Sequence, residues 1–276
     1  MVLPTPGSNN SAPKLVGVDV AFGVLHGRNG EDGTIQGLFE LAGIAYVGCG
    51  VLSSALCMDK AMTHTVLTAA GIRKSPLEVV RPGELEEFTL LEERLAAHLG
   101  YPMFVKPANS GSSVGISRAK NPEELLTALR TAFEYDSKAV VEQAVFGQEV
   151  ECSVIGDASP QAAQVLGEIS AQDGFYCYDS KYLTNTAGLF IPARIAPSIA
   201  ERVREIAVQA YKVMDCRGFA RVDFFVTADG EVILNEINTI PGFTSISIFP
   251  KLFEAAGIRT GELINRLVEG AKAGNL

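Results

Sequence analysis

Two carboxylates and one amide stand where they could hold a metal ion. Asp223 lies within an apolar, β-branched segment, residues 219–226, and Glu236 and Asn238 end a second segment that begins at residue 232. Segments of this composition are typical of β-strands. Carboxylate and amide oxygens are hard ligands that suit Mg²⁺, which takes one or two carboxylates and completes its shell with water and substrate phosphates. The residue types therefore indicate a magnesium site, provided that the two strands bring them together.

The turn between the two segments decides which residues face each other. Asp229-Gly230 is typical of a two-residue hairpin turn. With this turn, counting back along both strands places Asp223 opposite Glu236 and Arg221 opposite Asn238, with opposed Cβ atoms about 5 Å apart. A four-residue loop would keep the same face, whereas a three-residue loop with a bulge would spoil the count.

The alternative is an ordinary hairpin whose polar face lies in solvent. Strand alternation places Phe219 and Phe225 on the same face as Arg221 and Asp223. A face that mixes aromatic and charged side chains is more typical of the floor of a cleft than of a wet surface. We therefore favour the metal site over the solvent-exposed hairpin.

A loop rich in glycine and serine supplies a second chemical feature. Lys106 ends an apolar strand and opens a loop of small residues that runs to Gly115 and includes Ser112 and Ser113. Backbone N–H groups in such a loop can cradle phosphate, and a lysine adds a point charge. The chain has no Gly-Lys dipeptide, so this is not a Walker A loop. A flexible hairpin tip has the same composition, so the loop alone is a weak signal.

The composition is that of a soluble globular protein with room for more than one domain. The chain has 276 residues, 47% of them hydrophobic and 20% charged, which suits two or three packed domains. A formal net charge of −9 and the absence of any lysine or arginine cluster argue against nucleic-acid binding. An acidic chain can still bind a polyanion such as ATP if basic side chains and a metal gather in one cleft.

The cysteines and the N-terminus indicate a reducing, cytoplasmic setting. The 5 cysteines show no metal-ligand spacing, so we expect free buried thiols. The N-terminus lacks the basic segment and apolar run of a signal peptide. Residues 41–58 carry no charge, but Gly48 and Gly50 interrupt them. A strand at 44–47, a turn and a buried helix explain this stretch better than a membrane span.

The elements that must position these residues begin with a strand–helix–strand unit. Residues 16–25 are apolar enough for a buried strand and end in a glycine-dense turn. From Asp32, a plausible N-cap, apolar residues recur at helical spacing until Gly43, and the strand at 44–47 follows. This order predicts a parallel sheet.

Later segments continue to alternate between helical and strand patterns. Asp59 is expected to cap a helix that Gly71 ends. Residues 150–155 alternate apolar and polar, as a half-buried antiparallel strand does. We further expect helices at 84–99, 121–133, 198–214 and 260–273, and strands at 103–106, 114–117 and 139–142.

Several of these motifs occur together and in order in one superfamily. They are similar to the phosphate loop, the adenine-binding hinge, the ribose contact and the metal and transition-state block of ATP-grasp ligases. In this chain they are Lys106-Pro107 with residues 111–115, then Glu142-Gln143-Ala144-Val145, then Glu149, and finally residues 221–223 with 235–242.

Four further motifs narrow the resemblance to the D-alanine–D-alanine ligase family. They are His26-Gly27 with residues 30–33, Met58-Asp59-Lys60, residues 178–182, and residues 242–245. The resemblance runs from about residue 17 to the end. It implies an α/β (α+β) ATP-grasp fold with a partial parallel-sheet N-terminal domain at 1–59, a central α+β domain at 60–145, and a C-terminal antiparallel-sheet α+β domain at 146–276.

The resemblance also implies an activity. The family phosphorylates the carboxylate of one D-alanine with the ATP γ-phosphate, and the amine of a second D-alanine then displaces phosphate. Cations are needed where charge accumulates during such transfer. Carried over, the phosphate-holding lysines are Lys60, Lys106 and Lys181, the ligands of two Mg²⁺ (or Mn²⁺) ions are Asp223, Glu236 and Asn238, and the oxyanion partners are Arg221 and the Gly242 N–H.

The remaining roles follow from the same resemblance. The catalytic set adds Ser112, Tyr182 and His26, and the nucleotide set adds Ser112, Ser113, Glu142, Gln143, Ala144, Val145, Glu149, Phe225 and Asn235. The substrate set is Tyr182, Arg221, Gly242, Ser247 and Ile248, of which Ser247 and Ile248 match the second-substrate pocket. Residues 173–186 match a loop that closes over the site in the family and keeps water from the acyl phosphate. The partners implied are ATP and D-alanine as small-molecule substrates and a second copy of the chain in a homodimer.

The chain departs from the family at its start. The family opens with a strand and glycine turn that carry a glutamate for the ammonium of the first D-alanine, and nothing before Val16 supplies it. We therefore expect residues 1–59 to form a partial domain, which puts the first-substrate site in doubt. Two alternatives stay open: D-serine as the second substrate, or an inactive nucleotide-binding fragment. Lys181-Tyr182 favours an amine acceptor over D-lactate.

Overall fold

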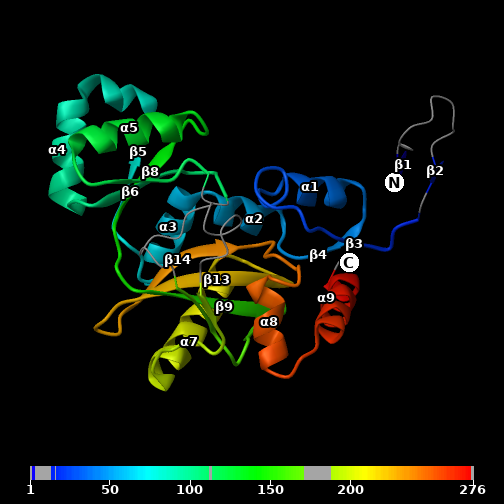
Figure 1. The fold of residues 1–276 in the computed structure, drawn as a ribbon. Helices are drawn as coiled ribbons and strands as arrows, with labels where there is room; N and C mark the ends of the chain where they lie inside the picture. The colour runs from blue at the N-terminus through cyan, green and yellow to red at the C-terminus, as the bar shows by residue number, and fades with distance from the viewer. Residues whose placement is uncertain (1, 4–13, 16, 112–113, 171–187, 275–276) are drawn as a thin grey trace.

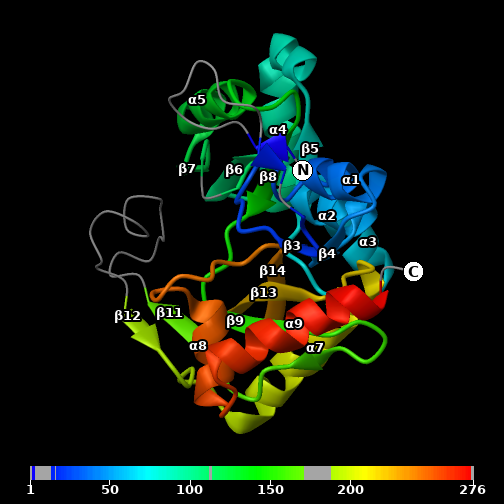
Figure 2. The same ribbon diagram turned by 90° about the vertical axis from the view of Figure 1, so that its right-hand side faces the viewer.

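The structure is a computed structural model that describes residues 2–3, 14–15, 17–111, 114–170 and 188–274. Helices pack around two larger antiparallel sheets and a small parallel pair (Figures 1 and 2). This mixed α/β architecture agrees with the fold class predicted from the sequence. Within the described residues, no helix is long and apolar enough to cross a membrane.

The predicted strand–helix–strand unit is present near the start of the chain. Its parallel strands are β3 (Val20–Phe22) and β4 (Ala45–Val47), joined by α1 (Thr34–Leu41). A short antiparallel pair, β1 (Val2–Leu3) with β2 (Lys14–Leu15), precedes it, and α2 (Val51–Met58) and α3 (Lys60–Ala69) follow. The strand predicted at 16–25 is confined to β3.

The N-cap predicted for α1 is wrong by one residue. Gly33 is the N-cap, with a φ of 90° that favours glycine. Asp32 lies one position earlier, where its carboxylate accepts hydrogen bonds from the backbone N–H groups of Asn29 at 2.8 Å and Thr34 at 3.0 Å. These bonds belong to the glycine-dense turn, so the aspartate shapes the turn that leads into the helix.

A four-stranded antiparallel sheet and two helices form the middle of the chain. The strand order is β5-β8-β6-β7, and α4 and α5 pack on the sheet through a shared apolar core that includes Leu95, Leu125 and Leu129. The helix predicted at 84–99 begins as a 3₁₀ turn. The elements are β5 (Leu77–Val80), η1 (Pro82–Glu87), α4 (Phe88–Leu99), β6 (Met103–Pro107), β7 (Ser117–Ala119), α5 (Pro122–Phe133) and β8 (Ala139–Gln143).

A six-stranded antiparallel sheet forms the rest of the chain. Its main order is β12-β11-β9-β13-β14, and β10 also pairs with β9. Helix α7 lies along one face, and α8 and α9 lie beside the sheet (Figure 2). The elements are β9 (Gln148–Ile155), β10 (Gln161–Ala162), β11 (Gly167–Ser170), β12 (Gly188–Phe190), α7 (Pro197–Val213), β13 (Phe219–Val226), β14 (Val232–Asn238), α8 (Ile248–Ala255) and α9 (Thr260–Gly274).

Strand β9 is more deeply buried than its alternating sequence predicts. Residues 150–154 are all buried, because β9 lies between β11 and β13 and has packed elements on both faces. Its polar residues Glu151 and Ser153 lie next to Asp223 and Arg221 on β13. The alternation therefore reflects a polar, buried face of the sheet rather than a solvated one.

The hairpin β13–β14 has the predicted residue pairs, but its turn differs from the predicted one and its strands contain a β-bulge. Asp223 lies opposite Glu236 and Arg221 opposite Asn238, as the turn count predicted. The turn, however, is a three-residue loop: the N–H of Thr227 donates to the carbonyl oxygen of Glu231 at 3.0 Å. A β-bulge then shifts the register between Asp223 and Phe224. The two one-residue shifts cancel, so the pairs beyond the bulge match those of a two-residue turn.

The described cysteines are buried free thiols, as predicted. They are Cys49, Cys57, Cys152 and Cys216, whereas Cys177 lies outside the described residues.

A close backbone contact joins the N-terminal unit to the hairpin. Gly218, which precedes β13, has a φ of 68°, and a Cβ there would lie 2.8 Å from the backbone nitrogen of Gly48. Gly48 follows β4, and its own Cβ would lie 3.2 Å from the ring of Phe219. Only glycine at both positions allows β4 to approach β13 this closely.

We expect Gly218→Ala to destabilise the protein by about 3 kcal/mol, because a left-handed backbone costs about 1–2 kcal/mol and the clash with Gly48 adds to it. Gly71→Ala is the matched control: its φ is 77°, but nothing lies within 4 Å of the added Cβ, so we expect a loss of about 1 kcal/mol. Urea unfolding followed by circular dichroism measures both. Equal losses would contradict the close-contact explanation.

Candidate functional site

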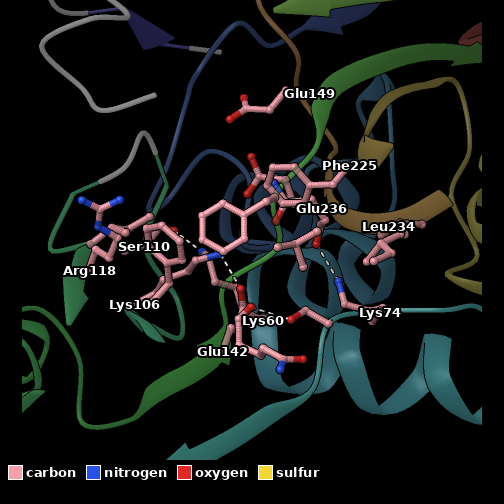
Figure 3. A pocket seen from close by; sticks show the side chains of 18 of the residues that line it. Lys60, Lys74, Lys106, Ser110, Arg118, Glu142, Glu149, Phe225, Leu234 and Glu236 are labelled. Carbon is pink, nitrogen blue, oxygen red and sulfur yellow. Dashed lines mark hydrogen bonds and ion pairs between the residues drawn. The ribbon is translucent and has the colours of Figure 1, made fainter. Parts of the chain in front are cut away.

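Most of the predicted nucleotide residues that the structure describes line one pocket between the two larger sheets (Figure 3). Three lysines and three carboxylates reach it: Lys60, Lys74 and Lys106 with Glu142, Glu149 and Glu236. Apolar side chains complete the wall, among them Phe104, Ile116, Phe225 and Ile233. Gln143, Val145 and Asn235 also line the pocket as predicted. Ala144 is not among the lining residues, and its backbone N–H donates to the carbonyl oxygen of Pro102 at 3.2 Å.

The ion pair between Lys106 and Glu142 lies inside this pocket. Lys106 Nζ is 2.6 Å from Glu142 Oε2, and both side chains are 14% exposed. Burial works to lower the pKa of Lys106, but Glu142 outweighs it and the pKa is raised. Burial likewise works to raise the pKa of Glu142, but Lys106 and Lys74 hold it below its usual range. Both groups are therefore charged at neutral pH and ready to meet a polar ligand.

Lys60 connects the start of α3 to the glycine-rich loop. Asp59 caps α3, as predicted, by accepting hydrogen bonds from the N–H groups of Ala61 at 3.0 Å and Met62 at 3.1 Å. The cap places Lys60 in the first turn, where its ammonium donates to the carbonyl oxygen of Ser110. Burial lowers the pKa of Lys60. The lysine therefore lies at the mouth of the predicted phosphate loop.

Lys74 is a pocket residue that the sequence analysis missed. It lies in the connection after α3, and its Nζ donates to the carbonyl oxygen of Asn235 at 2.6 Å. Burial, foremost, lowers its pKa to about 8, although Glu142 acts in the opposite direction. The only available signal was its place, shortly after the helix stop at Gly71 and next to Arg73. No strand or loop motif marked it as a pocket residue.

The predicted metal residues meet on the face of β13 and β14 that continues from the pocket. Both oxygens of Asp223 accept from Arg221, Oδ1 from Nε and Oδ2 from Nη2, each at 2.7 Å. Asn238 Nδ2 donates to Asp223 Oδ2 at 2.9 Å, so its amide oxygen points away from that carboxylate. Glu236 is paired with Asp223 across the hairpin. Asp223 and Glu236 line a small adjoining hollow together with Glu151.

This donor set fits Mg²⁺ by its chemistry. In the part of the chain that the structure describes, no three His, Cys, Asp or Glu side chains group so as to hold a metal. The predicted set has a different make-up, two carboxylates and one amide oxygen. Mg²⁺ takes few protein carboxylates and fills its shell with water and phosphate oxygens. Glu236 lines both the hollow that contains Asp223 and the pocket that contains the three lysines. The residues therefore suit a metal held jointly with a phosphate ligand.

Arg221 balances the acidic groups on this face. Its Nε lies 3.0 Å from Glu151 Oε2 in addition to its bonds with Asp223. Burial works to lower the pKa of Arg221, but Asp223 and Glu151 outweigh it and the pKa is raised.

At the far end of the same face, Phe219 is fully buried by the rings of Phe22, Phe243 and Phe249. Phe219 is thus covered rather than part of an open cleft floor, whereas Phe225 lines the pocket.

The glycine-dense turn approaches the hairpin through two side chains. His26 is exposed, and its Nδ1 lies 3.0 Å from the carbonyl oxygen of Ile240. Glu31 accepts hydrogen bonds from the N–H groups of Gly27 at 2.6 Å and Ile240 at 3.4 Å. Burial, foremost, raises the pKa of Glu31. Gly111 of the phosphate loop packs here, since its Cβ would lie 4.0 Å from Glu31 Oε2. Glu31 is a second residue to which the sequence analysis gave no role.

The predicted second-substrate residues lie in the turn after the hairpin. Ser247 Oγ accepts from the N–H of Thr244 at 3.0 Å and lies 2.9 Å from its hydroxyl. A Cβ on Gly242 would lie 2.5 Å from Ser247 Oγ, so a side chain there would displace the Ser247 hydroxyl. Ile248 begins α8 and packs against Gly167 of β11. The predicted residues Ser112, Ser113, Lys181 and Tyr182 lie outside the described residues.

Two family descriptions match this chain. "D-ala D-ala ligase C-terminus" matches residues 66–269, and "D-ala D-ala ligase N-terminus" matches residues 4–49. The chain is 49% identical over 256 residues to a D-alanine–D-alanine ligase of Caldicellulosiruptor bescii, covering 92% of this chain and 70% of that protein. It is 46% identical over 263 residues to D-alanine–D-alanine ligase A of Escherichia coli strain K12, covering 95% and 71%.

Solved structures give the same picture. The D-alanine–D-alanine ligase of Coxiella burnetii superposes with a TM-score of 0.81 and 37% identity, over 93% of this chain and 68% of that one. The VanG D-Ala:D-Ser ligase of Enterococcus faecalis superposes with a TM-score of 0.84 and 41% identity, over 94% and 74%.

We expect Glu142→Gln to cost about 3 kcal/mol at pH 7, because it leaves Lys106 charged and unpaired in the pocket. The pKa of Glu142 is lowered in the folded chain, so its contribution is present above the usual value of 4.5 and is lost as the pH falls through the folded value. The difference from wild type should therefore shrink in acid. Urea unfolding at several pH values measures it.

Glu78→Gln is the control for this substitution. Glu78 pairs at 3.2 Å with Arg94, whose side chain is 47% exposed, so we expect a loss of about 0.5 kcal/mol. A Glu142→Gln loss that is no larger than this, or that does not vary with pH, would contradict the buried-pair interpretation.

Proposed function

The chain belongs to the D-alanine–D-alanine ligase family, and we propose that it is an ATP-dependent ligase that joins two D-alanines for peptidoglycan precursors. The observation that carries this function is the meeting of a lysine-lined pocket with an acidic sheet face at Glu236. Phosphoryl transfer to a carboxylate needs both: cations around the phosphates and hard oxygens for a metal. The ATP-grasp fold places them between two sheets.

Different parts of the pocket wall match the base, the ribose and the phosphates of ATP. Phe104, Ile116 and Phe225 offer apolar surfaces to a base, and the hinge residues 142–145 run beside them with Glu142 and Gln143 in the lining. We assign Glu149 to the ribose hydroxyls, as in the family pattern. Lys60 and Lys106 then face the phosphates, and we assign Ser112, Ser113 and Lys181 to the same group.

The acidic face suits the reacting end of the nucleotide. Asp223, Glu236 and Asn238 would hold two Mg²⁺ or Mn²⁺ ions, which neutralise the charge that develops on the transferring phosphoryl group. Arg221 lies next to this set, and a planar guanidinium matches a carboxylate or a tetrahedral oxyanion. We assign the second oxyanion contact to the backbone N–H of Gly242, which the packing of Ser247 against it helps to fix.

The reaction follows from these positions. The carboxylate of the first D-alanine takes the γ-phosphoryl group and becomes D-alanyl phosphate, with ADP as the other product. The amine of the second D-alanine attacks the acyl carbon, and phosphate leaves. No protein nucleophile is needed. We assign Tyr182 and Lys181 to a closing loop, His26 to the first-substrate side, and Ser247 with Ile248 to the second-substrate pocket.

D-serine is the second candidate for the accepting amino acid. The similarity to the VanG D-Ala:D-Ser ligase at 41% identity favours testing it. A serine side chain adds one hydroxyl, and a site that hydrogen-bonds this hydroxyl discriminates strongly against alanine. The Ser247 hydroxyl is already bonded to Thr244, so it is engaged within its own turn, which supports D-alanine.

We further propose that the enzyme works in the cytoplasm as a homodimer, with ATP and D-alanine as its small-molecule substrates. Large apolar side chains that are exposed on α1 and α2, including Leu38, Leu41 and Leu52, are consistent with a second copy. Light scattering after gel filtration measures the mass, and a strictly monomeric protein at micromolar concentration would contradict the dimer.

We expect the purified chain to release phosphate and form a dipeptide when given ATP, Mg²⁺ and D-alanine. In a mixture with equal D-serine, mass spectrometry should find the alanyl-alanine product in excess. Dominant alanyl-serine would select the second candidate. Nucleotide binding without turnover, even at high D-alanine, would leave only a nucleotide-binding fragment.

We expect Asp223→Ala and Glu236→Ala each to lower turnover by about 1,000-fold or more, since a bound metal supplies several kcal/mol of transition-state stabilisation. Their binding of ADP in EDTA should persist, because the lysines remain. Asp229→Ala, an exposed position at the tip of the same hairpin, is the control and should leave turnover close to wild type. Retained activity in either of the first two variants would refute the metal assignment.

A further inference from the structure

The β-bulge at Asn235 decides which side chain of β14 faces Asp223. Phe224 pairs with Leu234, so an unbroken ladder would place Asp223 opposite Asn235, but its observed partner is Glu236. A one-residue slip turns every following side chain to the other face. Glu236 would then point with Leu234 into the apolar core that also holds Phe224. The metal-binding arrangement therefore depends on this bulge.

The connection between α3 and β5 lies beside the bulge. The N–H of Leu234 donates to the carbonyl oxygen of Arg73 at 3.0 Å, and Lys74 forms a parallel bridge with Leu234. The hydroxyl of Ser75 donates in turn to the carbonyl oxygen of Gln143 at 2.7 Å. The connection thus ties β14 of the six-stranded sheet to β8 of the four-stranded sheet.

The side chain of Lys74 ends on the bulge itself. Its Nζ donates to the carbonyl oxygen of Asn235 at 2.6 Å (Figure 3). A bulge leaves its extra residue outside the regular ladder, so that residue's polar groups depend on other partners. A charged donor makes a stronger bond than a neutral one. Glu142 and Glu236 lie close enough for their charges to favour the ammonium form of Lys74.

We propose that Lys74 is a positioning residue that locks the bulge at Asn235 and so keeps Glu236 on the metal-binding face. It acts through the backbone of the residue before Glu236. The inference rests on the proposed function to the extent that it takes Glu236 as a metal ligand. It adds a residue outside the motifs that the sequence analysis carried over from the family.

Binding of Mn²⁺ in the presence of ADP tests this role without catalysis. Electron paramagnetic resonance measures free Mn²⁺ during a titration of the protein. Lys74→Met keeps the unbranched shape and most of the length of the side chain and removes the donor. We expect it to weaken Mn²⁺ binding by about tenfold, the usual effect of losing a partner that orients a metal ligand. ADP is kept saturating for each variant, and ADP binding in EDTA measures separately any direct effect of removing the Lys74 charge from the pocket that it lines.

A second variant covers the case in which Lys74→Met does not fold. Lys74→Arg keeps a charged donor, and we expect its Mn²⁺ affinity to stay within about threefold of wild type, the size of a small geometric adjustment. Arg73→Met is the matched control: Arg73 pairs with Glu231, which joins the same two segments away from the bulge. Its Mn²⁺ affinity should stay close to wild type.

The outcomes separate this inference from the proposed function. A folded Lys74→Met with wild-type Mn²⁺ affinity, or a folded Lys74→Arg that loses tenfold, would overturn the role of Lys74. Equal losses in Lys74→Met and Arg73→Met would overturn it too, since they would show general loosening of the connection. If the wild type binds ADP and Mn²⁺ but forms no dipeptide, the ligase function fails while the Lys74 comparison still decides its own question.

Discussion

One extra residue in β14 sets the chemistry of the whole cleft. A three-residue turn would leave Asp223 opposite an amide and send Glu236 into the core, and the bulge at Asn235 restores the pairing of two carboxylates. The bulge is on β14 alone, so β13 keeps a regular alternation. Ala220, Val222, Phe224 and Val226 belong to the core that contains α7. Asp223 and Phe225 line the cleft. Strand pairing therefore supplies both a core and the floor of the cleft from the same eight-residue strand.

Charge balance explains how so many ionic groups can share a small volume. Lys106 is matched by Glu142, and Arg221 by Asp223 and Glu151. Lys60 and Lys74 instead donate to backbone carbonyl oxygens. Glu142 and Glu236 also act on both lysines through their charges, and because the two ammonium groups bond to neutral carbonyl oxygens, they remain attractive to an anion. Paired residues thus preserve the walls of the pocket, while the carbonyl-held lysines supply positive charge for the nucleotide that we propose binds there.

The sequence predicted the elements better than the contacts between them. Alternation, caps and glycine stops located most helices and strands, and Asp59 was correctly identified as a cap. The strand expected at 114–117 instead lies at Ser117–Ala119. The pairing of Asp223 with Glu236 was correct although the turn type was wrong, because two register shifts cancel. No local pattern could reveal that cancellation, or the contact of Lys74 with a residue far along the chain. Long-range contacts depend on tertiary packing, which composition and spacing do not encode.

The connection between α3 and β5 also covers part of the outer edge of β14. β14 ends the strand order of its sheet, and the outer side of an end strand is a template on which a foreign strand can pair. Here the backbone of Arg73 and Lys74 lies along that side and takes up the N–H of Leu234. The strand that carries Glu236 is thereby shielded from edge-to-edge association. A short segment outside the helices and strands thus covers part of the outer side of the strand that carries Glu236.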